Sequence, residues 1–146
     1  MQEKVFNLNV FKKLNELTHV NPREYSPLAL AYIGDAIYEI YIRDHVIKKA
    51  NAPVNKLHTT SKKYVKASAQ AQIYHFIKDL LTENELAILK RGRNAKSASS
   101  PKNGDIREYR LATGVEALIG FLYLNNEIER LTYIINTGIA QIERED

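Results

Sequence analysis

Two acidic residues stand among apolar neighbours, where a charged side chain needs a partner. Asp35 follows Leu-Ala-Tyr-Ile-Gly and Glu116 follows Thr-Gly-Val, and both segments have the periodicity of helices. A carboxylate that is buried alone is costly and usually takes up a proton instead. An arginine partner, a capping role or a metal ion would each remove this cost. Taken by itself, each residue is explained more simply by a structural ion pair than by catalysis.

Glycines accompany both acids. Gly34 precedes Asp35, while Gly114 and Gly120 lie on either side of Glu116. A glycine costs a helix interior roughly 1 kcal/mol relative to alanine, so close packing is a natural reason for it. If the two helices touch, Asp35 and Glu116 can face one pocket, and two adjacent carboxylates call for a cation. Because the chain has no cysteine, oxygen ligation suits Mg²⁺ or Mn²⁺ better than zinc. Plain helix packing would explain the glycines equally well.

The elements that must position these acids are predicted to be helices. Ser26 as N-cap and Pro27 in the first turn predict a long helix to about Lys49, apolar nearly all round in its early part and therefore central. A short helix is predicted in residues 1–22, with the stripe Val10, Leu14 and Leu17, and a long one over 55–81. The next helix runs from the Thr82–Glu85 capping box through Lys90, with Gly92 as its stop. Another runs from Asp105 to Leu124, with Glu108 completing a second capping box, and a last one ends near Glu143. Residues 93–104 read as the one clear loop. No segment alternates strictly, so we expect an all-α fold with five or six helices.

Length and composition indicate one globular domain over residues 1–146. The chain is 45% apolar and 26% charged, near the averages of folded proteins, and without cysteine it has no disulfide framework and no thiol nucleophile. Asp35 and Glu39 interrupt the longest apolar stretch, and no run approaches the roughly 18 residues that span a bilayer. The N-terminus lacks the pattern of a secretory signal. We therefore expect a soluble cytoplasmic protein.

The charges are segregated along the chain. The formal net charge is only +4, but residues 45–78 and 86–104 contain no Asp or Glu. The basic residues that we single out in these stretches are Lys62, Lys63, Lys66, Arg91, Arg93 and Lys96. Such segregation suggests a positive surface that meets a polyanion, whereas a solvated lysine-rich face is the simpler explanation if charge is the only clue.

Several of these segments resemble the ribonuclease III family. Residues 30–38, Leu-Ala-Tyr-Ile-Gly-Asp-Ala-Ile-Tyr, resemble its signature helix, and residues 111–120 resemble its second acidic helix. The run Arg-Gly-Arg-Asn-Ala-Lys-Ser at 91–97, with Pro-Lys-Asn at 101–103 and Tyr-Arg at 109–110, is similar to one branch in particular. That branch is the bacterial Mini-ribonuclease III, a catalytic domain without a double-stranded RNA-binding domain. The resemblance covers about residues 25–142.

The resemblance implies a ribonuclease III-like helical endonuclease domain and a function. It implies a Mg²⁺-dependent endoribonuclease, with Mn²⁺ as a possible substitute, that cleaves double-stranded RNA as a homodimer and leaves 5′-phosphate and 3′-hydroxyl ends. Maturation of the 23S ribosomal RNA precursor is the implied cellular task. Asp35 and Glu116 are the implied catalytic and metal-binding residues. The RNA contacts would come from Arg91 to Lys96 and from the lysines between 56 and 66.

Two positions depart from the wider family. Where the family carries a Glu and an Asp, this chain has Ala31 and Thr113, so that four carboxylates are reduced to two. The same losses are typical of the Mini branch, but they leave the number of metal ions open and motivate an alternative, a non-catalytic helical RNA-binding module on the same fold. Glu39 could join the site, although an exposed surface acid is the simpler interpretation. Tyr32, Tyr38 and Tyr41 are expected to be core or dimer contacts.

Overall fold

The computed structural model describes residues 10, 11, 13, 20–96 and 104–144, and over these residues the protein is all helical with no strand. The α-helices are α2 (Pro27–Lys49), α3 (Val54–Val65), α4 (Ala67–Ile77), α5 (Glu83–Asn94), α6 (Ile106–Leu124) and α7 (Ile128–Arg144), with short 3-10 turns η1 (Pro22–Glu24) and η2 (Lys78–Leu80). The all-α prediction is confirmed. The expected first helix lies mostly outside the described residues. Of its residues, 10, 11 and 13 are described, and these are helical.

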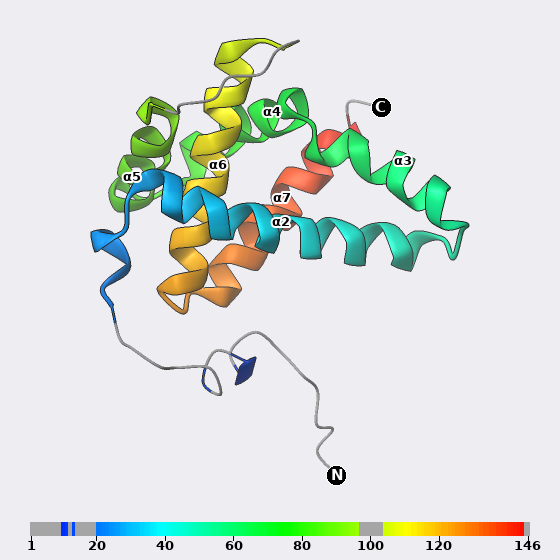
Figure 1. Cartoon of the computed structure of the whole chain (residues 1–146), viewed down its shortest axis with the longest axis horizontal. Helices are drawn as coiled ribbons and strands as arrows, with labels where there is room; N and C mark the ends of the chain where they lie inside the picture. The colour runs from blue at the N-terminus through cyan, green and yellow to red at the C-terminus, as the bar shows by residue number, and fades with distance from the viewer. Residues whose placement is uncertain (1–9, 12, 14–19, 97–103, 145–146) are drawn as a thin grey trace.

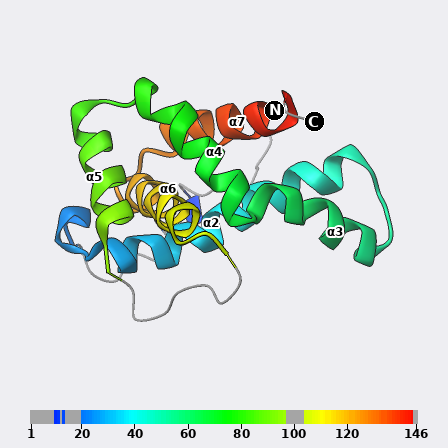
Figure 2. The same ribbon diagram turned by 90° about the horizontal axis from the view of Figure 1, so that it is seen from above.

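Helix α6 is the centre of the fold. Figure 2 looks nearly along its axis and shows α2, α4, α5 and α7 arranged around it. From Ala112 to Tyr123 every residue except Glu116 is buried, as expected for a helix that is apolar on all sides. Helix α2, which we had expected to be central, instead crosses α6 on one side and leaves its other face exposed (Figure 1). The C-terminal part of α2 and helix α3 form an arm that extends away from α6 (Figure 1).

Two glycines allow α2 and α6 to approach until their backbones touch. A Cβ atom added at Gly34 would lie 1.8 Å from the carbonyl oxygen of Glu116, and one added at Gly120 would lie 1.9 Å from the carbonyl oxygen of Leu30. Any side chain at either position would therefore force the helices apart. Close packing is thus the role that the structure gives these glycines, and the same packing brings the two acidic segments together.

The sequence interpretation was wrong about one helix and one helix end. The helix predicted over 55–81 is broken at Lys66, whose backbone is extended (φ −63°, ψ 153°), so that α3 and α4 meet at an angle. Periodicity missed this break because neither glycine nor proline marks it.

Gly92 does not stop α5, which continues to Asn94. It is buried against α6, where an added Cβ would lie 2.7 Å from the Cβ of Ala117. Arg91 and Arg93 therefore belong to the last turn of α5, and residues 97–103 of the expected loop lie outside the described residues.

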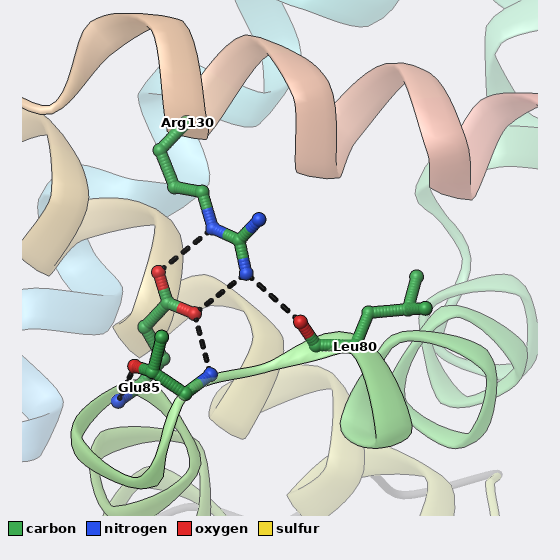
Figure 3. A network of polar contacts seen from close by, with 4 residues as sticks. Leu80, Glu85 and Arg130 are labelled. Carbon is green, nitrogen blue, oxygen red and sulfur yellow. Dashed lines mark hydrogen bonds and ion pairs between the residues drawn. The ribbon is translucent and has the colours of Figure 1, made fainter.

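The capping box predicted for α5 is present and extends into a buried ion pair (Figure 3). Thr82 and Glu85 bond reciprocally at the helix N-terminus. Both carboxylate oxygens of Glu85 also accept hydrogen bonds from Arg130 of α7, at 2.8 and 2.9 Å, and Arg130 donates to the carbonyl of Leu80 at 2.9 Å. Burial alone would raise the pKa of Glu85, but the Arg130 guanidinium outweighs it and lowers that pKa. This network joins α7 to the start of α5.

A second carboxylate joins three helices at the other end of α7. Glu143 accepts hydrogen bonds from Tyr64 of α3 at 2.7 Å and from His45 of α2 at 2.8 Å, and it pairs with Lys49. Burial alone would raise the pKa of Glu143, but these bonds outweigh it and lower that pKa to about 2. The arm formed by α2 and α3 is thereby attached to the C-terminal helix. No helix in the described part of the chain is long and apolar enough to cross a membrane.

Candidate functional site

Asp35 and Glu116 meet where α2 crosses α6. Asp35 follows the contact glycine Gly34 on α2, and its side chain is exposed, whereas Glu116 on α6 is half-buried. Burial of Glu116 raises its pKa to about 8, and a hydrogen bond and charge repulsion between its carboxyl and that of Asp35 act in the same direction. In that hydrogen bond the protonated carboxyl of Glu116 is the donor, and a nearby cation would favour its ionised form instead.

The donor chemistry of this pair fits a hard divalent cation. Carboxylate oxygens are the ligands that Mg²⁺ and Mn²⁺ prefer, and Mg²⁺ keeps several waters, so two protein ligands are enough for one ion. Among the described residues no group of three or more His, Asp or Glu side chains is placed to hold a metal. Asp35 and Glu116 would hold the ion, and the remaining positions of its coordination shell would be open to water and substrate.

The positions where carboxylates are missing take no part in this arrangement. Ala31 is buried in the core. The hydroxyl of Thr113 donates to the carbonyl of Tyr109 one turn earlier, at 3.0 Å, and is therefore committed to its own helix. Glu39 forms an ion pair with Arg43 at 3.0 Å, which agrees with its interpretation as a surface acid.

A residue that the sequence analysis missed lies beside Glu116. Gln70 of α4 is buried, and its Nε2 donates to the carbonyl of Val65 at 3.1 Å and to Oε2 of Glu116 at 3.5 Å. These bonds tie the break between α3 and α4 to the acidic pair. The only trace in the sequence is a glutamine within the small-residue run Ala-Ser-Ala-Gln-Ala, a pattern that by itself indicates no site.

The end of α5 and the start of α6 form a basic cleft of roughly 560 Å³ together with α4. Arg93, one of the predicted RNA-binding residues, lies in it, half-buried, and donates to the hydroxyl of Tyr74 at 3.0 Å. The acidic Asp105 and Glu108 line it too, and so do Arg107, Arg110 and His75. The sequence analysis assigned no RNA contact to the last three, because only the packing of α6 on α4 and α5 brings them to Arg93. The cleft can hold a polyanion backbone.

The other predicted basic residues are distributed over two places. Arg91 and Lys96 are exposed at and just beyond the end of α5. Lys62, Lys63 and Lys66 line a second, more open groove at the end of α3, of roughly 490 Å³. Lys62 and Lys66 are exposed, whereas the Nζ atom of Lys63 lies 5.2 Å from the centre of the Tyr64 ring, within cation–π distance.

Proteins of known family are similar to this chain in sequence and in fold. The family model described as Ribonuclease III domain matches residues 28–127, more than half of the chain. The chain belongs to the ribonuclease III family, a family of endoribonucleases that act on double-stranded RNA with a divalent metal ion, and it is an endoribonuclease.

Within this family the chain is similar to proteins named Mini-ribonuclease 3. The relative from Thermoanaerobacter sp. is 50% identical over 127 residues, which cover 87% of this chain and 89% of the relative. The relative from Clostridium tetani is 50% identical over 129 residues, which cover 88% and 85%. A crystal structure of a protein from Fusobacterium nucleatum superposes with a TM-score of 0.73 at 37% identity, covering 81% of this chain and 94% of that one. The predicted resemblance to the Mini branch is confirmed.

Proposed function

We propose that this protein, as a single ribonuclease III-like domain over residues 1–146, cleaves double-stranded RNA with Mg²⁺ held by Asp35 and Glu116. Mn²⁺ would substitute, because it accepts the same oxygen ligands. The observation that carries this proposal is the convergence of the two carboxyls at the α2–α6 crossing, where the charge of Asp35 repels that of Glu116. Repulsion between two carboxyls would not stabilise the fold, so packing alone gives no reason to place these two acids side by side.

The residues of the chain divide the work of phosphodiester hydrolysis. Asp35 and Glu116 bind the ion, and Gly34 and Gly120 keep their helices close enough for both to reach it. Arg93, Arg107 and Arg110 hold the RNA backbone in the basic cleft, and the lysines of the second groove extend the contact. The bound ion would activate a water and stabilise the charge that develops on the scissile phosphate. Breaking the bond between phosphorus and the 3′ oxygen gives 5′-phosphate and 3′-hydroxyl ends.

We propose a homodimer formed through the exposed face of α2. Leu28, Tyr32, Ile40 and Ile47 follow one another at spacings of four, eight and seven residues along this face, and Tyr32 is 83% exposed. A row of large apolar side chains in water is typical of a protein interface. Of the other tyrosines expected to be core or dimer contacts, Tyr38 is buried in the core. Two copies joined here carry two acidic pairs, one for each RNA strand.

In the cytoplasm the proposed substrate is the 23S ribosomal RNA precursor.

The decisive test is Asp35→Asn, which keeps the shape of the side chain and removes its charge. Purified wild-type protein should cut a long RNA duplex in Mg²⁺ and stop when a chelator is added. The D35N protein should bind the duplex with nearly unchanged affinity and not cut it. Cleavage by D35N would refute the proposed site.

The alternative of a non-catalytic RNA-binding module is set aside, because the chain belongs to a family of endoribonucleases. Ala31 and Thr113 bear instead on the number of metal ions, since two carboxylates are left to hold them.

A further inference from the structure

Gln70 carries an unpaired polar atom in the interior of the protein. The residue is 3% exposed, and its Oε1 is fully buried without a hydrogen-bond partner among the described residues. Its Nε2 has both hydrogens engaged, one to the carbonyl of Val65 and one to Glu116. The carboxamide thus spans the break between α3 and α4 on one side and the acidic pair on the other.

The orientation of the carboxamide is fixed by chemistry. The Val65 carbonyl can only accept a hydrogen bond, so the nitrogen of Gln70 must face it at 3.1 Å. The same nitrogen then faces Glu116, and the oxygen is left on the side without a donor. Turning the amide over would pair the oxygen with another acceptor at Val65. The unpaired atom is therefore built into the arrangement.

A buried acceptor without a partner lowers the stability of a fold, whereas an apolar side chain of the same shape would leave no such atom. Stability alone does not account for glutamine here. What glutamine adds is its Nε2 contact with Oε2 of Glu116, which holds one oxygen of that carboxyl on the α4 side. The other oxygen is left to act beside Asp35.

We propose that Gln70 is a positioning residue of the Asp35–Glu116 site: it acts through Glu116, orienting that carboxylate for the divalent ion. The proposal rests on the proposed function of the acidic pair. Residues that orient a metal ligand affect metal affinity by roughly 10- to 100-fold, without contacting the ion. Gln70 has the place and the donor for this role.

The test is the affinity of the metal itself, measured as Mn²⁺ binding by titration calorimetry and electron paramagnetic resonance on full-length protein without RNA. Gln70→Met keeps the length of the side chain and removes both polar atoms. We expect its Mn²⁺ affinity to fall at least tenfold. Its unfolding temperature should stay close to that of the wild type, since the loss of the Val65 bond is offset by removal of the unpaired oxygen. Gln72→Met, two residues further on the exposed side of α4, is the matched control and should change neither quantity.

Asp35→Asn is measured alongside, so that failure of this inference is distinguishable from failure of the proposed site. If D35N loses Mn²⁺ binding and Q70M keeps it within twofold of the wild type, Gln70 is only a structural residue and the inference is wrong. If D35N keeps Mn²⁺ binding, the proposed metal site itself is wrong, and the inference falls with it. A crystal structure of the wild type with Mn²⁺ covers the case in which Q70M does not fold. We expect Nε2 of Gln70 to donate to Glu116 while that residue ligates the ion, and a Gln70 turned away from Glu116 would overturn the inference.

Discussion

Replacing Gly34 by alanine should separate α2 from α6 and so weaken both the fold and the acidic pair. The added Cβ would lie 1.8 Å from the carbonyl oxygen of Glu116 and 2.7 Å from its carbonyl carbon. Contacts of a real Cβ below 3.0 Å are essentially never seen, so the backbones must part by about 1.2 Å at this point. No side chain can rotate away to relieve the contact, because both obstructing atoms belong to the backbone.

The expected size of the effect follows from two opposing contributions. Alanine in place of glycine favours the helix by at most about 1 kcal/mol. Overpacking a core costs about 1–3 kcal/mol even where side chains can adjust, and a backbone obstacle places this substitution at the upper end or beyond. We expect a net loss of about 2 kcal/mol or more in the free energy of unfolding, which corresponds to about 8 °C in unfolding temperature for a chain of this size.

The effect on cleavage should exceed the effect on stability. A displacement of about 1 Å at a reacting centre can cost roughly 100-fold in rate. Cleavage of duplex RNA by Gly34→Ala, measured well below its unfolding temperature, should therefore fall by about two orders of magnitude. The matched control is Gly138→Ala on α7, where the three atoms nearest to the new Cβ are side-chain carbons of Ile73, at 3.0 Å. It should change stability by less than about 1 kcal/mol and leave cleavage intact. If G34A were as stable and as active as G138A, the assignment of Gly34 to a backbone contact would be wrong.

Three further predictions concern the ion pairs and the basic cleft. The carboxyl of Glu143 has a pKa of about 2 in the folded protein against an ordinary value of 4.5, so its stabilising contribution is complete above pH 4.5 and is lost as the pH falls toward 2. Chemical denaturation of Glu143→Gln over this pH range should show a flatter dependence than the wild type, and an identical dependence would disprove the contribution. Arg130→Met should lower the free energy of unfolding by about 3 kcal/mol, because it leaves Glu85 buried without its ion-pair partner. Adding Glu85→Gln to this variant should recover part of the lost stability. If the double variant is no more stable than R130M, the loss comes from packing and not from the unpaired charge. Replacing Arg91 and Arg93 together by alanine should reduce the slope of log affinity for duplex RNA against log salt by about two, and an unchanged slope would show that the RNA does not contact this end of α5.

Much of the helical framework could be predicted from local signals. The cap at Ser26 and the box at Thr82 mark the starts of α2 and α5, and both are present as hydrogen bonds. The break at Lys66 could not be predicted, because extended backbone at an ordinary lysine leaves no mark in composition. Gly92 was misread for a related reason: a glycine near a helix end serves equally as a stop or as a packing contact, and only the neighbouring helix decides which.

The candidate site divides in the same way. Asp35 and Glu116 stood out in the sequence because a carboxylate among apolar residues conflicts with its surroundings, and residue type alone reveals that conflict. Gln70 and Arg107 did not stand out, since an uncharged polar residue and a surface arginine conflict with nothing nearby in the chain.

Local sequence was enough to predict the helices, the two acids among apolar residues and the glycines beside them, because each is a property of residues within a few turns of one another. The central place of α6, the contact of Gln70 with Glu116 and the cleft shared by arginines of α5 and α6 became visible only in the folded chain. These relations join different helices, so they depend on how α2, α4 and α5 pack against α6, and for α2 that packing is set by backbone contact at two glycines.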